Sequence, residues 1–309
     1  MQSKQEKTYI ASPLNYTGGK AKLLPQIEPL FPQNISVFLD LFCGGCNVGI
    51  NIAAEQTIYN DVNSNLIGLY KTFKRLKPET IVKKINEIID YYGFSRTSEH
   101  SFAFYGGDNE KGVSVYNRDK YLRLRNDFNS LETKNNHYYI MLYCLILFGF
   151  NNQIRFNANG KFNLPVGKRD FNDVIREKLI CFIDCIKTQN ASFFCKDFEK
   201  VDISLLDNNS LVYVDPPYLI STATYNESDG WNENDELRLL NYLDYLNANN
   251  IRFALSNILK HKGRTNKLLQ EWLRKSDYKV FHLRKDYSNS NYQVKEKETK
   301  TDEILVINY

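Results

Sequence analysis

The stretch NNSLVYVDPPYLIS, Asn208 to Ser221, is the starting point for interpreting the fold. Residues 212–214 are β-branched and aromatic, as in a short strand buried inside an α/β sheet. Pro216 and Pro217 cannot donate hydrogen bonds to a sheet, so the strand must end at Asp215. A carboxylate therefore stands at the carboxyl end of a strand, where open α/β sheets bind their ligands. For these residues alone, a capped turn without chemistry is the alternative.

The composition is that of an ordinary globular protein. Of the 309 residues, 42% are hydrophobic and 25% are charged, and a chain of this length suggests about two domains. The net charge of +4 permits a polyanionic partner without requiring one. The sequence contains no secretory signal and no run of 18 apolar residues. We therefore expect a cytoplasmic protein with no membrane partner.

The six cysteines fit reduced thiols in such a compartment. Cys43 and Cys46 form a C-x-x-C motif, but no second pair and no histidine cluster accompanies them. Because structural zinc needs four ligands, this motif alone does not predict a metal or redox site. We expect no metal.

Two further segments carry the marks of a ligand site. SVFLDLFCGGCNVGIN, residues 36–51, starts with an apolar strand, turns at Gly44 and Gly45, and continues into a helix-like pattern from Val48. The next short strand, in TIYND, ends in Asp61. A Gly-rich turn lets the backbone approach a ligand closely, and an acid after the next strand suits the hydroxyls of a ribose. Together with the acid after residue 214, these features predict a nucleoside site.

A nucleotide-binding ATPase is the rival interpretation of the N-terminal segment LNYTGGKAKLLPQI. Gly18, Gly19 and Lys20 resemble the end of a phosphate-binding loop. However, Leu14 stands where that loop needs Gly, and Ala21 replaces the Ser or Thr that binds magnesium. The turn CGGCNVG does not fit the dinucleotide motif G-x-G-x-x-G either. Both classes are therefore disfavoured.

The middle of the chain differs from its two ends. Residues 77–190 form helical segments rich in Tyr and Asn, with one strongly apolar helix at about residues 136–148. Apolar residues then flank an Asn159-Gly160 pair, which predicts a β-hairpin. After residue 190, short strands alternate with helices, which favours a largely parallel sheet. We predict one α/β domain, residues 1–76 and 191–309, with residues 77–190 as an inserted domain.

Six segments, in a fixed order over essentially the whole chain, resemble the Dam-like, alpha-group DNA adenine-N6 methyltransferases: YTGGKAKLLPQI, FLDLFCGGCNVGIN, YNDVNSNLIGLYK, RFNANGKFNLPVGKR, VYVDPPY and FALSN. The resemblance implies a Rossmann-like sheet that binds S-adenosylmethionine, with a mainly helical and β-hairpin DNA-recognition insert. It also implies methyl transfer to the N6 amino group of an adenine in a short duplex DNA sequence. The target base must be flipped out of the duplex to reach the site. The sulfonium of the donor is already activated, so the reaction needs no metal.

The resemblance also assigns roles to individual positions. The catalytic positions match Asp215, Pro216, Pro217 and Tyr218. The cofactor positions match Tyr16, Lys20, Phe42, Gly44, Gly45, Asp61, Asp197, Phe198 and Asp215; at Tyr16 many relatives have Trp. In the hairpin, the DNA-contacting candidates are Arg155, Asn157, Lys161, Lys168 and Arg169. Chemically, Asp215 and the carbonyl of Pro216 would accept hydrogen bonds from the amino group, and Tyr218 would stack on the base.

A basic segment follows the last motif. From Ile258 to Lys300 there are 12 Lys and Arg and 5 Asp and Glu. Such a surface predicts salt-dependent phosphate binding; an ordinary basic helix and loop is the alternative.

Several functional alternatives stay open at this point. They are cytosine-N4 methylation, which more often has Ser in place of Asp215, a catalytically inactive DNA-binding relative, and methylation of RNA or of protein glutamine. We expect either a restriction-modification enzyme, with a cognate restriction endonuclease acting on the same site, or a phage or orphan Dam.

Overall fold

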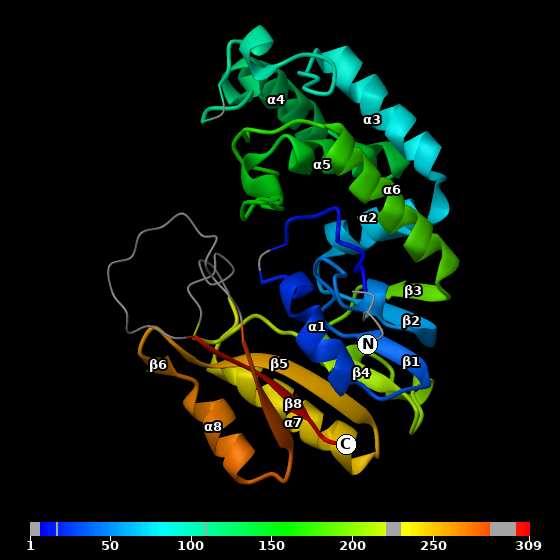
Figure 1. The fold of residues 1–309 in the computed structure, drawn as a ribbon, viewed down its shortest axis with the longest axis vertical. Coiled ribbons are helices and arrows are strands. Elements are labelled where there is room, and N and C mark those ends of the chain that lie inside the picture. Colours follow the sequence, from blue (N-terminus) through cyan, green and yellow to red (C-terminus); the bar gives the residue numbers. More distant parts are fainter. Residues whose placement is uncertain (1–6, 17, 109, 221–229, 285–300) are drawn as a thin grey trace, which may run out of the picture. The chain divides into compact units, whose positions relative to one another are not determined.

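The computed structural model describes residues 7–16, 18–108, 110–220, 230–284 and 301–309. The chain forms two compact units (Figure 1). Unit 1 comprises Met1–Gly19 and Asn63–Gln189, and unit 2 comprises Lys20–Val62 and Asn190–Tyr309. Helix α2 (Ser64–Arg75) groups with unit 1, whereas the predicted domain division assigned it to the α/β part.

Unit 2 is built on one sheet with the order β3-β2-β1-β4-β5-β8-β7, and β6 pairs with β5. The five parallel strands are β1 (Ile35–Asp40), β2 (Ala54–Asn60), β3 (Ala191–Phe194), β4 (Leu211–Val214) and β5 (Arg252–His261). The antiparallel strands are β6 (Arg264–Thr265), β7 (Lys279–Leu283) and β8 (Asp302–Ile307). The predicted α/β class and the largely parallel sheet are confirmed.

The helices of unit 2 bury one face of this sheet. Asn232 caps α7 (Glu233–Ala248) in a capping box with Asp235, and Asn266 caps α8 (Lys267–Arg274). Both helices share an apolar core with alternate residues of the central strands. A short N-terminal segment adds η1 (Ala21–Leu23), α1 (Leu24–Ile27) and η2 (Glu28–Leu30). Further 3-10 turns are η3 (Gly49–Asn51), η6 (Phe198–Lys200) and η7 (Ile203–Leu205).

The helix expected from Val48 is wrong, because only the single turn η3 lies between β1 and β2. The connection packs directly against the sheet. The N–H of Gly49 donates to Asp40 Oδ2 at 3.2 Å, and a Cβ at Gly49 would lie 2.6 Å from the ring of Tyr59. The apolar residues after the Gly-rich turn are therefore buried by a compact loop and not by a helix.

Unit 1 is mainly helical and is organised around one buried helix. That helix is α5 (Asn136–Leu147), and it contacts α2, α3 and α4. The other helices of the unit are α3 (Pro78–Tyr92), α4 (Ser114–Asn129) and α6 (Asp173–Thr188), with 3-10 turns η4 (Phe102–Tyr105) and η5 (Phe150–Asn152). The apolar helix predicted near residues 136–148 is confirmed. No helix among the described residues is both long enough and apolar enough to cross a membrane.

The predicted hairpin is also present in unit 1. Phe156 and Phe162 form an antiparallel bridge, and the N–H of Gly160 donates to the Asn157 carbonyl at 2.9 Å to close the turn. Asn129 of α4 holds the returning arm, since its side chain bonds both the N–H and the carbonyl of Phe162, at 2.8 and 3.0 Å. The apolar side of the hairpin is thereby fixed to the helices, and its turn is exposed.

Candidate active site

A buried charge cluster lies where β4 ends. The Nζ of Lys20 donates to the two carboxylate oxygens of Asp215 at 2.8 and 2.9 Å, and also to the hydroxyl of Tyr218. The Tyr218 hydroxyl in turn donates to Asp215 Oδ1 at 2.7 Å. A second carboxylate, Glu303 of β8, lies 3.5 Å from the same Nζ. Three of the predicted site residues are thus brought together, with a fourth that the sequence did not single out.

Burial and charge shift the pKa values of Lys20 and Tyr218 in this cluster. Burial by itself would lower the pKa of Lys20, but the carboxylates of Asp215 and Glu303 outweigh it and raise that pKa above its ordinary value. Burial, with the same two carboxylates, also raises the pKa of Tyr218 well above its ordinary value. The ammonium is therefore charged and the phenol neutral. With two acids to one lysine, the cluster has a net negative charge.

The two prolines after Asp215 hold the end of the strand rigidly. Pro216 is buried and Pro217 is half-buried, and each ring fixes its φ angle. The Asp215 side chain keeps 18% of its surface exposed, so the carboxylate is anchored on one side and accessible on another. Such an acid can accept a hydrogen bond from an incoming amino group.

Next to β4 in the sheet, the ends of β1 and β2 form the second part of the site. Asp61 directly follows β2, is 9% exposed, and accepts a hydrogen bond from the N–H of Gly44 at 3.1 Å. Gly44 has φ +44°, a left-handed conformation that favours glycine, and Gly45 is buried in the same turn. The structure therefore joins the Gly-rich turn to the acid predicted to bind a ribose.

Asn60, which the sequence analysis missed, ties this region together. Its Nδ2 donates to the Leu41 carbonyl at 3.1 Å and to the Lys196 carbonyl at 3.0 Å, and its Oδ1 accepts from the Lys196 N–H at 3.1 Å. One buried side chain thus fixes the loops after β1 and β3 on both sides of Asp61. The only sequence signal was its place just before that acid.

Aromatic rings line the next part of the same edge. The Phe42 and Phe198 ring centroids are 5.5 Å apart, and the Trp231 ring meets Phe42 edge-on at 5.7 Å. Trp231 was not predicted, because no quoted motif covers it. The carboxylate of Asp197 accepts a hydrogen bond from Arg238 Nη2 at 2.9 Å and caps η6. The rings of Phe42, Phe198 and Trp231 form an aromatic wall at this edge of the sheet.

Asp40, also missed, lies buried at the end of β1. Burial, together with the charges of Asp215 and Asp61, raises the pKa of Asp40 to about 8, although the hydrogen bond from Gly49 acts in the opposite direction. Asp40 is therefore largely protonated at neutral pH, which limits the negative charge beneath the site. The signal in the sequence was an acid inside an otherwise apolar strand.

The C-x-x-C thiols belong to the packing of the Gly-rich turn. Cys43 and Cys46 are buried thiols, and burial raises the pKa of the Cys43 thiol well above its usual range. Within the described ranges, no group of three or more His, Cys, Asp or Glu side chains is placed to hold a metal ion.

These residues fit an S-adenosyl group. Asp61 offers a carboxylate to ribose hydroxyls, the aromatic wall offers apolar surface to a purine, and the negative cluster at Asp215 suits a sulfonium. The strands that carry them are neighbours in the order β3-β2-β1-β4. Because parallel strands end at one edge, all these groups share that edge.

The remaining predicted residues belong to unit 1. They are Tyr16 and the five hairpin residues Arg155, Asn157, Lys161, Lys168 and Arg169.

Arg155 and Asn157 form hydrogen bonds within the hairpin itself. The Arg155 guanidinium donates to the Asn163 side chain at 2.9 Å and to its carbonyl at 2.8 Å. The Asn157 side-chain oxygen accepts two backbone N–H groups at 3.0 Å to form the turn. The other three, Lys161, Lys168 and Arg169, are exposed.

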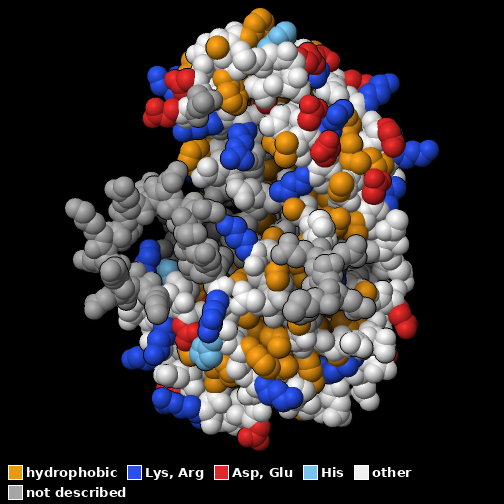
Figure 2. Space-filling model, viewed as in Figure 1, with side chains coloured by type: hydrophobic (Ala, Val, Ile, Leu, Met, Phe, Trp, Pro, Cys, Tyr) orange, Lys and Arg blue, Asp and Glu red, His pale blue; other side chains and the backbone are white. Residues whose placement is uncertain are grey.

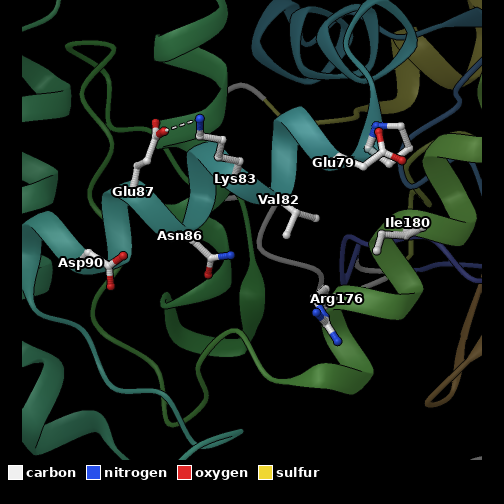
Figure 3. A pocket seen from close by; sticks show the side chains of 9 residues that line it. Glu79, Val82, Lys83, Asn86, Glu87, Asp90, Arg176 and Ile180 are labelled. Carbon is white, nitrogen blue, oxygen red and sulfur yellow. Dashed lines mark ion pairs between the residues drawn. The ribbon is translucent and has the colours of Figure 1, made fainter.

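A hollow in unit 1 and the basic segment after residue 257 are two further surface features. A hollow of about 560 Å³ in unit 1 is lined by α3 and α6, including Glu79, Glu87 and Arg176 (Figure 3). Its charges are of both signs, and it contains no arrangement of a reactive group with a base. The predicted basic segment is only partly described, since residues 285–300 lie outside the described residues. In Figure 2 the Lys and Arg side chains are scattered over the visible face.

Comparisons with known proteins agree with this geometry. A family model for D12 class N6 adenine-specific DNA methyltransferases matches residues 16–289. The chain is 41% identical over 308 residues to the type II methyltransferase M.FokI of Planomicrobium okeanokoites, and 40% identical over 309 residues to the modification methylase StsI of Streptococcus sanguinis. Each alignment covers 98% of this chain but 43% of the relative, so the chain spans less than half of their lengths. The DNA adenine methylase of Escherichia coli K12 is 26% identical over 298 residues, which cover 95% of this chain and 94% of that protein.

Proposed function

Because the chain belongs to the D12 class of N6 adenine-specific DNA methyltransferases, we propose that it transfers a methyl group from S-adenosylmethionine to the N6 amino group of adenine in a short duplex DNA sequence. The observation that carries the proposal is the Lys20-Asp215-Tyr218 cluster at the end of β4, beside the pairing of Gly44 with Asp61. The acid that we propose as acceptor for the amino group and the acid that we propose to bind the ribose thus lie at one edge of one sheet.

The residues of the cluster suit the chemistry of an aromatic amine. The lone pair of the adenine amino group is delocalised into the ring, so the enzyme must hold the group in line with the methyl carbon. In the proposed reaction Asp215 and the Pro216 carbonyl accept hydrogen bonds from the amino group, and Tyr218 stacks on the base. As nitrogen bonds the methyl carbon and the carbon–sulfur bond breaks, positive charge develops on nitrogen, and the negative cluster stabilises it. The amino group then loses one proton, with Asp215 as the nearest acceptor.

The donor supplies a methyl group on a sulfonium and leaves as a neutral thioether. In the proposal Asp61 binds the ribose of the donor, and Phe42 and Phe198 contact its adenine. The turn at Gly44 and Gly45 lets the protein backbone approach the donor closely. Asp197, Lys20 and Tyr16 complete the set of cofactor-side residues that the resemblance assigned. No metal enters this scheme.

The proposal includes double-stranded DNA as partner, with the target base flipped out of the duplex. Flipping costs a few kcal/mol, which stacking on Tyr218 would offset by about 1–3 kcal/mol. Exposed Lys161, Lys168 and Arg169 would contact DNA, together with Arg155 and Asn157. Both substrates are found inside cells, so we place the enzyme in the cytoplasm. By analogy with relatives named modification methylases, we propose that a cognate restriction endonuclease acts on the same site without contacting this chain.

Transfer of labelled methyl groups from S-adenosylmethionine to unmethylated genomic DNA tests the proposal. We expect N6-methyladenine at one short motif, found by nucleoside analysis and single-molecule sequencing. We expect Asp215→Ala to abolish transfer and to leave DNA binding largely intact. Methylcytosine would assign the enzyme to the neighbouring amino-group reaction, and no transfer by the wild-type protein would refute catalysis and favour a DNA-binding protein.

A further inference from the structure

A buried carboxylate in unit 2 has no place in the mechanism above. Glu236 of α7 is fully buried, and burial raises its pKa. Its Oε2 accepts a hydrogen bond from Trp231 Nε1 at 2.7 Å. Its Oε1 accepts from Asn266 Nδ2 at 2.7 Å and from Asn257 Nδ2 at 3.2 Å. All three donors are neutral, so these bonds hold the carboxylate without a counter-charge.

The orientation of each donor is fixed from its other side. The Asn266 side-chain oxygen caps α8 by accepting the N–H of Leu269 at 3.1 Å, and the Asn257 oxygen accepts the N–H of Ile258 at 2.7 Å. Both amides must therefore turn their NH2 groups to Glu236. With an indole N–H as the third donor, both oxygens of residue 236 must act as acceptors.

The indole held in this way belongs to the aromatic wall of the proposed donor site. The Trp231 ring centroid lies 5.7 Å from that of Phe42 and 6.0 Å from that of Phe198. Phe42 follows β1 and Phe198 follows β3, so Trp231 joins from a third segment, just before α7. It is partly exposed, whereas its polar edge is bonded to a buried acid. A ring fixed at its polar edge presents apolar surface at little entropic cost.

We propose that Trp231 is a third aromatic contact of the adenosine moiety of the donor, and that Glu236 is the positioning residue that holds its indole. This inference rests on the proposed function, because it places the S-adenosyl group beside Phe42 and Phe198. It adds a binding residue and its support to that site. The competing explanation is that Glu236 only joins β5 to the caps of α7 and α8.

Fluorescence can test the contact directly, because the chain has two tryptophans, Trp231 and Trp272. Trp272 makes a matching bond, from its Nε1 to Asp244 Oδ1 at 2.9 Å, outside the aromatic wall. In a Trp272→Phe variant all tryptophan emission comes from Trp231, and titration with S-adenosylhomocysteine should change it saturably. The Trp231→Phe variant, which emits from Trp272 alone, should show no saturable change.

Calorimetric titration with the same ligand gives the energetic test. Trp231→Ala should raise the Kd about tenfold, as expected for loss of one aromatic contact to a base. Glu236→Gln should raise it several-fold, because an amide has one acceptor oxygen and cannot receive all three donors. Trp272→Ala and Asp244→Asn, which break the matching indole–carboxylate pair, should leave the Kd within about twofold, because Trp272 packs against Phe253 and Tyr278 and not against the aromatic wall.

The outcomes separate this inference from the function on which it rests. If the wild-type protein binds no donor analogue, the proposed function fails and the inference with it. If the wild-type protein binds but Trp231→Ala keeps the wild-type Kd and the emission of Trp231 does not respond, the inference alone is overturned. A folded Glu236→Gln variant with normal affinity would overturn the positioning role; should that variant not fold, Trp231→Phe and Trp231→Ala still decide the contact.

Discussion

Replacing Lys20 with Met would test whether one buried lysine neutralises both Asp215 and Glu303. The residue is 2% exposed, and its Nζ lies 2.8 Å from Asp215 and 3.5 Å from Glu303, which is itself 3% exposed. Methionine keeps an unbranched apolar side chain but removes the ammonium. Breaking a buried ion pair by removing one partner costs about 3–5 kcal/mol, because the other charge stays buried. We expect the free energy of unfolding to fall by about that amount.

The decisive comparison combines this change with Glu303→Gln. With Lys20 present, Glu303→Gln removes an attraction and should lower stability. With Met at position 20, the same change removes a buried carboxylate that has lost its attraction to the Lys20 ammonium, and it should raise stability. The sign of the effect should therefore invert between the two backgrounds, in a double-mutant cycle measured by urea unfolding and circular dichroism at pH 7.

Lys22 is the matched control for the cycle. It is an exposed lysine two residues away, and Lys22→Met should change the free energy of unfolding by no more than about 0.5 kcal/mol. An effect of Glu303→Gln with the same sign and size in both backgrounds would refute the argument, since it would mean that Lys20 does not neutralise Glu303.

Three further predictions concern the ribose site, pH and DNA. Asp61→Ala should weaken binding of the methyl donor about tenfold or more, because two ribose hydroxyls lose a charged acceptor worth about 1.5–3 kcal/mol. Calorimetry measures the affinity for the donor, and an unchanged affinity would mean that the ribose lies elsewhere. Burial raises the pKa of Asp40 to about 8, so between about pH 4 and 8 the folded protein binds more protons than the unfolded chain. The contribution of Asp40 to the free energy of unfolding is therefore complete below about pH 4, and it is lost as the pH rises through about 8. Asp40→Asn should flatten that fall, which is at most about 1.4 kcal/mol per pH unit, in unfolding experiments across this range; a wild-type slope in the variant would exclude Asp40 as its source. Lys168→Ala should weaken binding to all DNA sequences alike and reduce the slope of log Kd against log salt by about 1. A change confined to one sequence would instead indicate a base contact.

Local patterns in the sequence were enough for the strands that precede Asp215 and Asp61 and for the acids themselves. The run before Asp215 and the one before Asp61 are short, apolar and bounded by turn residues, so their ends could be located before any contact was known. These features depend on neighbours within a few residues of each other.

Features that depend on distant residues were not predictable in the same way. Glu303 matters because β8 pairs antiparallel with β5, which brings residue 303 to Lys20. Glu236 matters because α7, β5 and the cap of α8 meet around it. The missing helix after Val48 has a similar origin, since the close approach of Gly49 to Tyr59 favours a compact loop. In each case tertiary contact decides between states that the local pattern leaves open.

The hydrogen bonds of Asp215 indicate where the target amino group can bind. An ionised carboxylate offers about four acceptor positions, two on each oxygen. Among the contacts of the described residues, Lys20 occupies one position on each oxygen and Tyr218 a second on Oδ1. A position on Oδ2 therefore remains for the amino group, next to the Lys20 ammonium. We predict that Asp215→Asn, which keeps the shape but has one acceptor oxygen, loses methyl transfer nearly as completely as Asp215→Ala while keeping its affinity for DNA. Substantial turnover by the Asn variant, measured with labelled donor, would show that the Pro216 carbonyl alone suffices.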